Sequence, residues 1–188
     1  MLDDRVRNVL RRLEEEEPRP PGVPVAPMTG RFLFSLVAPQ ADCEVLEIGA
    51  GRGYSTIWLA AGVRNLAGRV LSLEADSGCI GDWRRNVSEA GVDDVADVIE
   101  GDARETLPEI DDVFDLVFLD AANKQYEELF CLARGKLESG ALVVADDVIL
   151  HADTLQPYVD ARHADPTLLS ITVPLDRGLE LSVVLRDA

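Results

Sequence analysis

Acidic residues follow two of the apolar runs that read as buried strands in this sequence. Asp120 comes directly after residues 114–119, and Asp146 and Asp147 come directly after residues 141–145. If these strands are neighbours in an open parallel sheet, the three carboxylates meet at the edge where ligands bind. Such a group is strongly repulsive without a cation, and its oxygen ligands suit Mg²⁺, or alternatively Ca²⁺ or Mn²⁺. Asp120, Asp146 and Asp147 are the predicted metal ligands. In the alternative interpretation Asp146 points inward and Asp147 caps or faces water.

A glycine-rich turn marks a second site for chemistry. Residues 45–48 read as a buried strand, and Gly49, Gly51 and Gly53 follow before a helix begins over 55–61. Glycine adopts positive φ values and lets a ligand approach the main chain closely. The strand–turn–helix unit presents backbone N–H groups and the positive end of a helix to that ligand. The turn is therefore a predicted ligand cradle.

The surroundings of this turn argue against a dinucleotide. Tyr54 occupies the position where a G-x-G-x-x-G fingerprint requires its third glycine. Glu47, Glu74, Asp102 and Asp120 lie at or near the ends of four successive predicted strands and so reach one sheet edge. A ring of carboxylates repels pyrophosphate but suits hydroxyl groups, an ammonium, a sulfonium or a metal ion. Each acid alone could be a solvated loop residue, but the repetition at four strand ends favours a ligand site.

The elements that must hold these residues alternate between strand and helix from residue 44 onward. This alternation predicts an α/β fold: a doubly wound, Rossmann-like, seven-stranded sheet, mostly parallel, with helices on both faces and a C-terminal antiparallel hairpin. Further strands are predicted at 69–73, 95–100, 168–173 and 179–185, and further helices at 30–37 with Thr29 as cap, at 77–90 with Asp76 or Ser77 as cap and Gly91 as stop, at 124–137 and at 154–164.

The N-terminal segment differs from the rest of the chain. Residues 2–16 predict a helix whose apolar face serves packing or self-association in a homodimer. Residues 17–27 contain five prolines and predict a stiff, non-helical linker, with a lid as an alternative role. We therefore expect an N-terminal helix and proline-rich linker over 1–27 and a single domain over 28–188. The apolar face of the helix is formed by Val6, Leu10 and Leu13.

Composition limits the classes of protein that fit. A length of 188 residues suits one domain with a full core. The formal net charge of −17 opposes unaided binding to nucleic acid or to an anionic membrane. The sequence has no apolar run of about 18 residues and no apolar signal region, so we expect a cytoplasmic protein without a membrane span. Cys43, Cys79 and Cys131 are odd in number and far apart, which predicts buried free thiols.

Five segments together resemble the class I S-adenosylmethionine-dependent methyltransferases, and more narrowly the cation-dependent catechol/caffeoyl-CoA-type O-methyltransferase family. The resemblance covers about residues 28–186. Because five motifs match in the right order, it is more specific than the glycine-rich motif alone. The segments are VLEIGAGRGYSTIWLA at 45–60, GDARETLPEI at 101–110, FDLVFLDAANKQY at 114–126, GALVVADDVIL at 140–150 and VPLDRGLELSVVLR at 173–186.

The resemblance implies a role for each candidate residue. The three glycines would shape the turn around the methionine part of S-adenosylmethionine, Glu74 would bind the ribose hydroxyls, and Asp102 with Ala103 would lie beside the adenine. Asp120 is the first catalytic candidate. Lys124 is the second because it follows Asp120 by four residues, within reach of a substrate hydroxyl, and the alternative is a solvated lysine in the first turn of a helix. The acceptor would offer two adjacent oxygens to the cation held by Asp120, Asp146 and Asp147. The cofactor-binding set is Glu47, Gly49, Gly51, Gly53, Tyr54, Ser55, Glu74, Ala75, Asp102, Ala103 and Asp120.

The chain departs from the family pattern at two positions. Asp147 stands where the family usually has asparagine, which adds one carboxylate to the cation site. The family commonly places a lysine three residues after the first metal-binding aspartate, but that position is Asn123 here and Lys124 follows it. On a helix, one residue is a rotation of about 100°, so Lys124 points in a different direction from the family lysine.

Three functions follow as hypotheses. The leading one is O-methylation of a small catechol-like acceptor. The second is methylation of a hydroxylated uridine in tRNA, because some bacterial members of the family resemble such enzymes, although no basic stripe supports it. The third is a cofactor-binding protein that has lost catalysis, which the displaced Lys124 favours.

Overall fold

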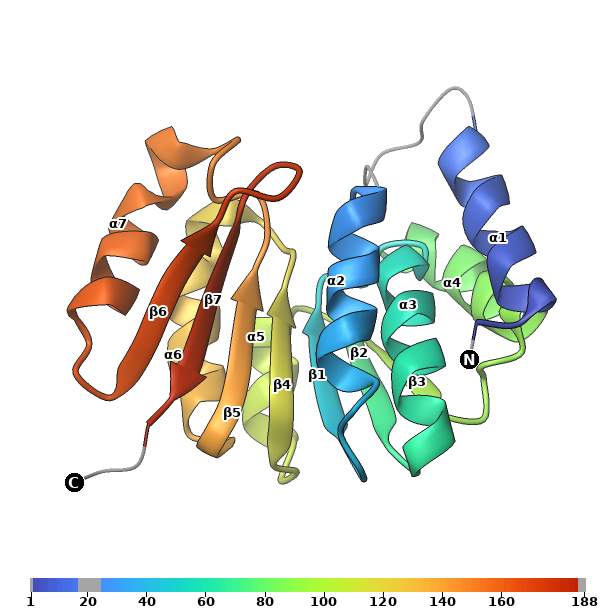
Figure 1. Cartoon of the computed structure of the whole chain (residues 1–188), viewed down its shortest axis with the longest axis horizontal. Helices are drawn as coiled ribbons and strands as arrows, with labels where there is room; N and C mark the ends of the chain where they lie inside the picture. The colour runs from blue at the N-terminus through green and yellow to red at the C-terminus, as the bar shows by residue number, and fades with distance from the viewer. Residues whose placement is uncertain (1, 17–24, 186–188) are drawn as a thin grey trace.

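The computed structural model describes residues 2–16 and 25–185. Seven strands form one sheet in the order β3-β2-β1-β4-β5-β7-β6 (Figure 1). The strands are β1 Glu44–Ile48, β2 Arg69–Glu74, β3 Ala96–Glu100, β4 Phe114–Leu119, β5 Leu137–Ala145, β6 Leu168–Val173 and β7 Leu179–Val184. The α-helices are α1 Asp4–Glu15, α2 Pro27–Val37, α3 Tyr54–Val63, α4 Ser77–Ala90, α5 Ala103–Thr106, α6 Tyr126–Arg134 and α7 Ala152–Ala164, and the 3-10 helices are η1 Arg64–Leu66, η2 Leu107–Glu109 and η3 Asn123–Gln125.

Strand alternation divides the core into two layers. Val45 and Phe118 face the layer that contains α1 to α4, whereas Leu46 and Val117 face the layer that contains α5 to α7. Successive residues of a strand point to opposite faces, so a central strand covered on both sides must be apolar throughout. The doubly wound architecture predicted from the sequence is confirmed. The antiparallel pairing of β7 with both β5 and β6 confirms the C-terminal hairpin.

The order of the strands reverses between β1 and β4, which lie side by side although β2 and β3 separate them in the chain. Backbone hydrogen bonds continue past the strand ends there. The amide of Asp120 donates to the carbonyl of Ile48 at 2.9 Å, and the amide of Asp146 donates to the carbonyl of Leu119 at 2.9 Å. The chain therefore places acidic residues side by side at a topological switch point, where open α/β sheets bind ligands.

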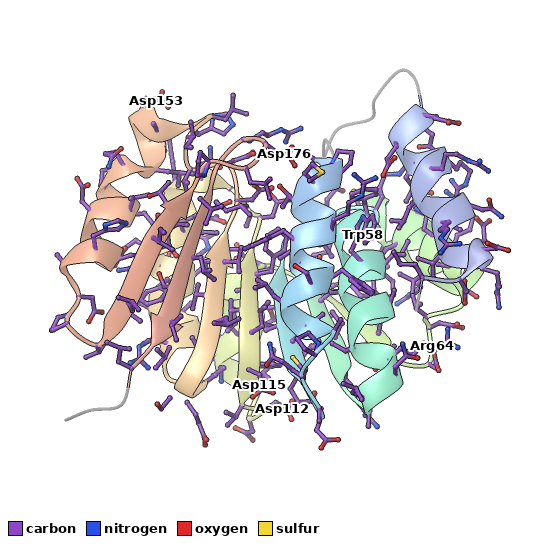
Figure 2. All side chains as sticks on the ribbon, in the orientation of Figure 1. Trp58, Arg64, Asp112, Asp115, Asp153 and Asp176 are labelled. Carbon is purple, nitrogen blue, oxygen red and sulfur yellow. The ribbon has the colours of Figure 1, made fainter. Side chains whose placement is uncertain are left out.

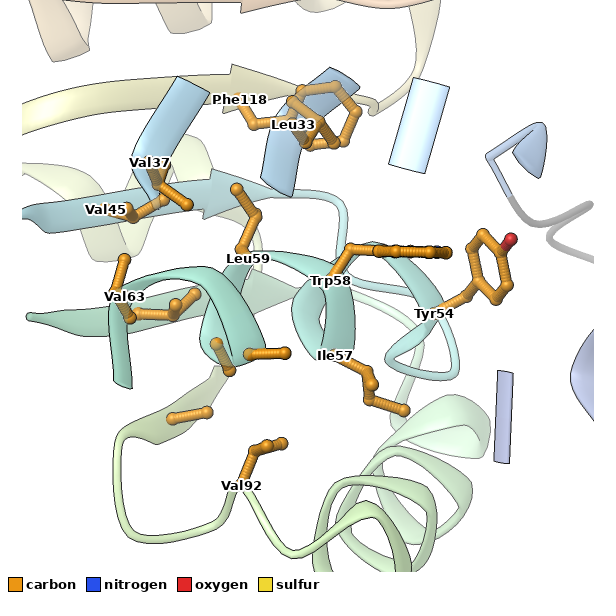
Figure 3. Close-up of a cluster of buried hydrophobic side chains, with 14 of the residues drawn as sticks. Leu33, Val37, Val45, Tyr54, Ile57, Trp58, Leu59, Val63, Val92 and Phe118 are labelled. Carbon is orange, nitrogen blue, oxygen red and sulfur yellow. The ribbon is translucent and has the colours of Figure 1, made fainter. Parts of the chain in front are cut away.

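Helix α3, which follows the glycine turn, is buried along its whole length. Side chains of α2 and β1 enclose it, as Figure 3 shows for Leu33, Val37 and Val45 against Leu59 and Val63. Phe34 of α2 meets the ring of Trp58 edge to face, with ring centroids 6.4 Å apart. This enclosure fixes the start of the helix and, with it, the glycine turn.

The N-terminal helix is present, and its predicted apolar face is confirmed. Val6, Leu10 and Leu13 are buried together with Val9, and α1 packs on α3 and α4. Asp3 caps it by accepting a hydrogen bond from the amide of Val6. The predicted linker falls largely on residues 17–24, outside the described residues.

Two predictions about the next segment are wrong. Pro27 is not part of a linker but the first residue of α2. A backbone N–H at this position has no acceptor within the helix, so proline, which lacks an N–H, loses no hydrogen bond there. Thr29 does not cap a helix at Gly30, because it lies inside α2. Its amide and hydroxyl donate instead to the carboxylate of Asp176, at 2.7 and 3.1 Å.

The boundaries around α6 also differ from the prediction. The helix predicted over 124–137 begins as the 3-10 turn η3, continues as α6 and stops at Arg134, with Gly135 as its C-cap. Strand β5 then begins at Leu137 rather than at residue 141 and contains a register shift against β4. Gly140, at φ +95°, lets the strand bend there.

Two further expectations have separate outcomes. Cys43, Cys79 and Cys131 are free as expected, but burial is confirmed for Cys43 alone, since Cys79 is half-buried and Cys131 is exposed. Among residues 2–16 and 25–185, no helix combines the length and apolar character that crossing a bilayer requires.

Candidate active site

A pocket of about 290 Å³ opens at the carboxyl edge of the parallel strands. This volume is near the lower end of the usual range for ligand sites, about 300–1,000 Å³. Its walls come from the ends of β1 to β4 and from η3 and α6. The predicted site residues that line it are Gly49, Glu74, Ala75, Asp102, Ala103 and Asp120.

The glycine turn forms the floor beside β1. Gly49 has a φ of +95°, and a Cβ there would collide with the backbone carbonyl of Asp120. The amides of Gly49 and Ala50 both donate to the carbonyl of Leu73, at 2.9 and 3.2 Å. The turn is thus locked between β2 and β4, and glycine is required at its first position by close packing as well as by φ.

Glu74 joins the end of β2 to this turn. Its Oε2 accepts a hydrogen bond from the amide of Gly51 at 2.6 Å, and its Oε1 accepts one from the amide of Asp76 at 2.7 Å. Hydrogen bonds from two backbone groups fix the orientation of the carboxylate. A carboxylate held in this way at a pocket wall suits the recognition of hydroxyl groups.

Asp102 forms the opposite wall as the N-cap of α5. Its carboxylate accepts from the backbone amide of Arg104 at 2.9 Å and pairs with the Arg104 guanidinium, with Nη2 and Oδ2 2.5 Å apart. The bond from the Arg104 side chain is the main cause that lowers the pKa of Asp102 to about 2. Asp102 is therefore a fixed negative charge beside Ala103 across the ordinary pH range.

Glu47 lies behind the pocket and does not line it. Its Oε2 accepts hydrogen bonds from the hydroxyls of Thr56 and Ser72, and Trp83 donates in turn to the Thr56 hydroxyl. The side chain is fully buried, and this burial raises the pKa of its carboxyl above the ordinary value despite the hydroxyl donors. Glu47 can therefore act on a ligand only through the elements it holds together, β1, β2 and α3.

Four other predicted cofactor residues, Gly51, Gly53, Tyr54 and Ser55, also lie outside the pocket lining. Gly53, at φ +90°, is the N-cap of α3, and Ser55 is buried in the first turn of that helix. The ring of Tyr54 is buried, and its hydroxyl donates to Oε1 of Glu14 in α1 at 2.6 Å. These residues shape the turn or anchor the N-terminal helix to it.

The carboxylates of Asp120, Asp146 and Asp147 lie together at the ends of β4 and β5. Burial, followed by the charges of Asp146 and Asp147, raises the pKa of Asp120 well above its ordinary range. Burial is also the main cause that raises the pKa of Asp146 to about 7. Tyr126 ties the two strand ends together, because its buried hydroxyl donates to the carbonyls of Leu119 and Asp146 at 3.2 and 3.3 Å. The structure thus brings together the acids that the sequence grouped.

Asp147 has an unusual backbone and an incompletely bonded side chain. Its φ is +66°, in the left-handed region that aspartate tolerates better than most residues. Its amide donates to Oδ1 of Asp146 at 2.8 Å. Its own Oδ1 is buried without a hydrogen-bond partner among the described residues, and Nη1 of Arg177 lies 3.6 Å from it. His151 lies near the other oxygen, with Nε2 at 3.8 Å from Oδ2.

The donor chemistry of this acidic cluster fits a hard cation. A buried carboxylate oxygen without a hydrogen bond beside two further carboxylates is a ligand set that Mg²⁺ or Ca²⁺ satisfies. Within residues 2–16 and 25–185, however, no three acidic, histidine or cysteine side chains are arranged closely enough to hold a metal ion as they stand. The carboxylates would have to close around such an ion.

Lys124 lies in η3 with an exposed side chain, next to the pocket-lining Gln125. Sequence reasoning missed Arg177, which lies between β6 and β7 in the turn at 174–178. It is separated from Asp147 by thirty positions in the sequence, and no periodic pattern connects the two. A lone arginine in a turn-type sequence carries no signal of where its guanidinium points.

Comparison with known proteins is consistent with this geometry. Residues 46–148 match a family model described as a methyltransferase domain. A catechol O-methyltransferase from Niastella koreensis is 30% identical over 176 residues, which cover 89% of this chain and 79% of that protein. A catechol O-methyltransferase from Mycobacterium tuberculosis is 37% identical over 142 residues, which cover 75% of this chain and 64% of that protein. The crystal structure of an O-methyltransferase from Bacillus cereus in complex with SAH has a TM-score of 0.82 and 28% identity, covering 97% of this chain and 91% of that one.

Proposed function

This chain belongs to the S-adenosylmethionine-dependent O-methyltransferases, and we propose that it methylates one hydroxyl of a small acceptor with two adjacent oxygens, such as a catechol, with the help of a divalent cation. The relatives named as catechol O-methyltransferases support the acceptor class. The acidic cluster beside the pocket supports the cation.

We assign the cofactor to the pocket at the ends of β1 to β4. Glu74 would accept hydrogen bonds from the ribose hydroxyls, Asp102 and Ala103 would border the adenine, and the turn that begins at Gly49 would hold the methionine part. When bound, S-adenosylmethionine supplies an electrophilic methyl group on its sulfonium sulfur. The contribution of the protein is then to hold this group and the acceptor oxygen in line.

We assign the cation to Asp120, Asp146 and Asp147, with Mg²⁺ as the first choice and Ca²⁺ or Mn²⁺ as alternatives. When bound there, a divalent cation would supply Lewis-acid chemistry that makes an acceptor hydroxyl more acidic near neutral pH. Lys124, next to the pocket-lining Gln125, is the second catalytic candidate and would contact the acceptor hydroxyl.

One observation carries the proposal: Asp120 belongs to both parts of the site. It lines the pocket, and its carboxylate also interacts with those of Asp146 and Asp147. A cofactor in the pocket and an acceptor bound at the acidic cluster would meet at this residue. Proximity of this kind accounts for much of the rate of a transfer between two bound molecules.

The test is methyl transfer from labelled S-adenosylmethionine to a panel of dihydroxyaromatic compounds, with Mg²⁺ and after chelation. Asp146→Asn should lose transfer at low Mg²⁺, recover part of it at high Mg²⁺ and keep its affinity for S-adenosylhomocysteine. Asp153→Asn, which alters an exposed acid a few residues away (Figure 2), is the matched control and should behave like the wild type. Transfer that survives exhaustive chelation would remove the cation from the proposal, and a panel without any methylated product would remove the acceptor class.

An RNA acceptor is the alternative that the same assay addresses. The four arginines of the N-terminal helix all have partners: Arg12 pairs with Glu16 and Glu89, Arg7 pairs with Asp4, Arg5 donates to the carbonyl of Ser88, and Arg11 donates to the side chain of Asn8. With a net charge of −17, these pairs leave little positive field for phosphates. Label that enters hydroxylated tRNA and not the small acceptors, with binding that weakens steeply as salt rises, would favour the alternative.

A further inference from the structure

Arg177 is the cationic side chain that lies against the acidic cluster. Its Nη1 is 3.6 Å from Oδ1 of Asp147, and its charge opposes the upward pKa shifts of Asp120 and Asp146. The side chain of Asp147 is only 14% exposed and that of Arg177 is 25% exposed, so solvent screens the pair less than it screens a surface ion pair. The guanidinium therefore belongs to the electrostatics of the cluster.

The backbone around Arg177 is fixed on two sides. Its carbonyl accepts hydrogen bonds from the amides of Ile149 and Leu150, at 3.1 and 2.9 Å, in the segment that follows Asp147. The neighbouring Asp176 accepts the two hydrogen bonds from Thr29 at the start of α2, where Figure 2 shows it beside the end of that helix. The backbone at Arg177 is thus held between α2 and the segment that follows β5, which fixes the point from which its side chain extends.

The charges of this group match a divalent cation. With an ion bound, the three carboxylates would be ionised and contribute −3, and the guanidinium would contribute +1, which leaves a net charge of −2 around the ion. Without Arg177 the net charge around the ion would be −3. With Arg177 present and an amide in place of the carboxylate at position 147, the net charge would be −1. The distance of 3.6 Å exceeds that of a direct hydrogen bond, so Oδ1 of Asp147 remains available to a second partner.

We propose that Arg177 sets the cation affinity of the site by sharing the carboxylate of Asp147 with the bound ion. This inference rests on the cation site of the proposed function. Arg177 is then a positioning residue: it holds Asp147 when no ion is present and reduces the affinity for the ion when one binds. The affinity of the site is consequently lower than three carboxylates alone would produce.

The experiment measures Mn²⁺ binding by electron paramagnetic resonance in the full-length protein, without acceptor and independently of turnover. Arg177→Gln should tighten binding about tenfold, which corresponds to about 1.4 kcal/mol. Arg177→Lys keeps the charge and should stay within about threefold of the wild type. Arg64→Gln removes the same unit of charge from an exposed pair with Asp94 at the far end of the molecule and should change nothing (Figure 2).

A double-mutant cycle tests the sharing itself. In an Asp147→Asn background, Arg177→Gln should change Mn²⁺ affinity by less than about threefold, because the shared carboxylate is gone. An equal tenfold change in both backgrounds would overturn the inference, since Arg177 would then act only as a distant charge. Unchanged affinity in Arg177→Gln, with normal binding in the wild type, would overturn it while leaving the proposed cation site intact. If neither protein binds Mn²⁺, the inference and the cation assignment fail together. Melting temperature and affinity for S-adenosylhomocysteine check that each variant is folded.

Discussion

Arg52, inside the glycine turn, is held by Glu16 directly after α1. Nη1 of Arg52 lies 2.6 Å from Oε2 of Glu16, and its Nε lies 2.7 Å from Oδ2 of Asp82 in α4. The carbonyl of Arg52 accepts a hydrogen bond from the Asn86 side chain at 2.8 Å. The N-terminal helix therefore braces the turn that borders the proposed cofactor pocket.

This brace predicts that Glu16→Gln weakens the binding of S-adenosylhomocysteine. A net hydrogen-bond contribution of about 0.5–1.5 kcal/mol corresponds to a loss of about threefold to tenfold in affinity. Titration calorimetry measures it. Asp4→Asn removes the exposed pair with Arg7 on the same helix and is the control, since that pair lies away from the turn. Equal affinities in all three proteins would show that the turn keeps its shape without α1.

Glu74 and Glu100 provide a matched pair on neighbouring strands, where they are partners in the register of β2 and β3. Glu74→Ala should weaken S-adenosylhomocysteine binding by more than about tenfold, because the carboxylate proposed to bind the ribose is lost. Glu100→Ala, which removes an exposed side chain, should have little effect. Thermal unfolding with ligand at about a hundredfold excess over the wild-type Kd should show about 2.7 kcal/mol of stabilisation in the wild type and in Glu100→Ala. Equal shifts in both variants would contradict the assignment of Glu74.

Gly49 and Gly51 should respond differently to alanine. Both have positive φ values, but a Cβ at Gly51 meets no atom within 4 Å, whereas one at Gly49 meets the backbone of Asp120. Gly51→Ala should therefore lower the unfolding free energy only by the cost of a left-handed conformation at a residue with a Cβ, about 1–2 kcal/mol. Gly49→Ala must in addition displace the end of β4, and we expect a loss above about 3 kcal/mol. Urea unfolding measures both losses. Similar values would mean that the end of β4 can be displaced at little cost in free energy.

Glu47 makes the stability of the cofactor-free protein depend on pH. Burial raises the pKa of its carboxyl above the ordinary 4.5. The protonated carboxyl therefore stabilises the folded state fully below pH 4.5, and this stabilisation is lost as the pH rises through the pKa of the folded state. Glu47→Gln removes this pH dependence. The unfolding free energy of the variant, measured relative to that of the wild type, should therefore increase from pH 5 to pH 8. Urea unfolding of both proteins at the two pH values gives the difference. The exposed Glu109→Gln should show no such trend, and a constant difference for Glu47→Gln would contradict the buried, proton-binding role.

The amino-acid sequence by itself determined the sheet, both helical layers and the edge at which the acids gather. Alternating apolar runs bounded by glycine and aspartate are local signals, and the carboxyl ends of parallel strands meet at one edge in any doubly wound sheet. For this reason Asp120, Asp146 and Asp147 could be grouped before any coordinates. The start of α2 was harder to predict, because proline can begin a helix as well as prevent one. The end of α6 was harder to predict because β5 already begins at Leu137 and continues through Gly140.

The tertiary structure alone decided which charges meet. Arg177 lies thirty positions from Asp147, and Arg52 lies thirty-six positions from Glu16. Neither arginine belongs to a periodic pattern, since each comes from a turn whose direction depends on the packing of distant elements. The enclosure of Glu47 by Thr56 and Ser72 has the same origin, because it needs α3 and β2 to close over β1. Backbone periodicity is a local property of a chain, whereas the pairing of side chains from separate loops exists only after the core has packed.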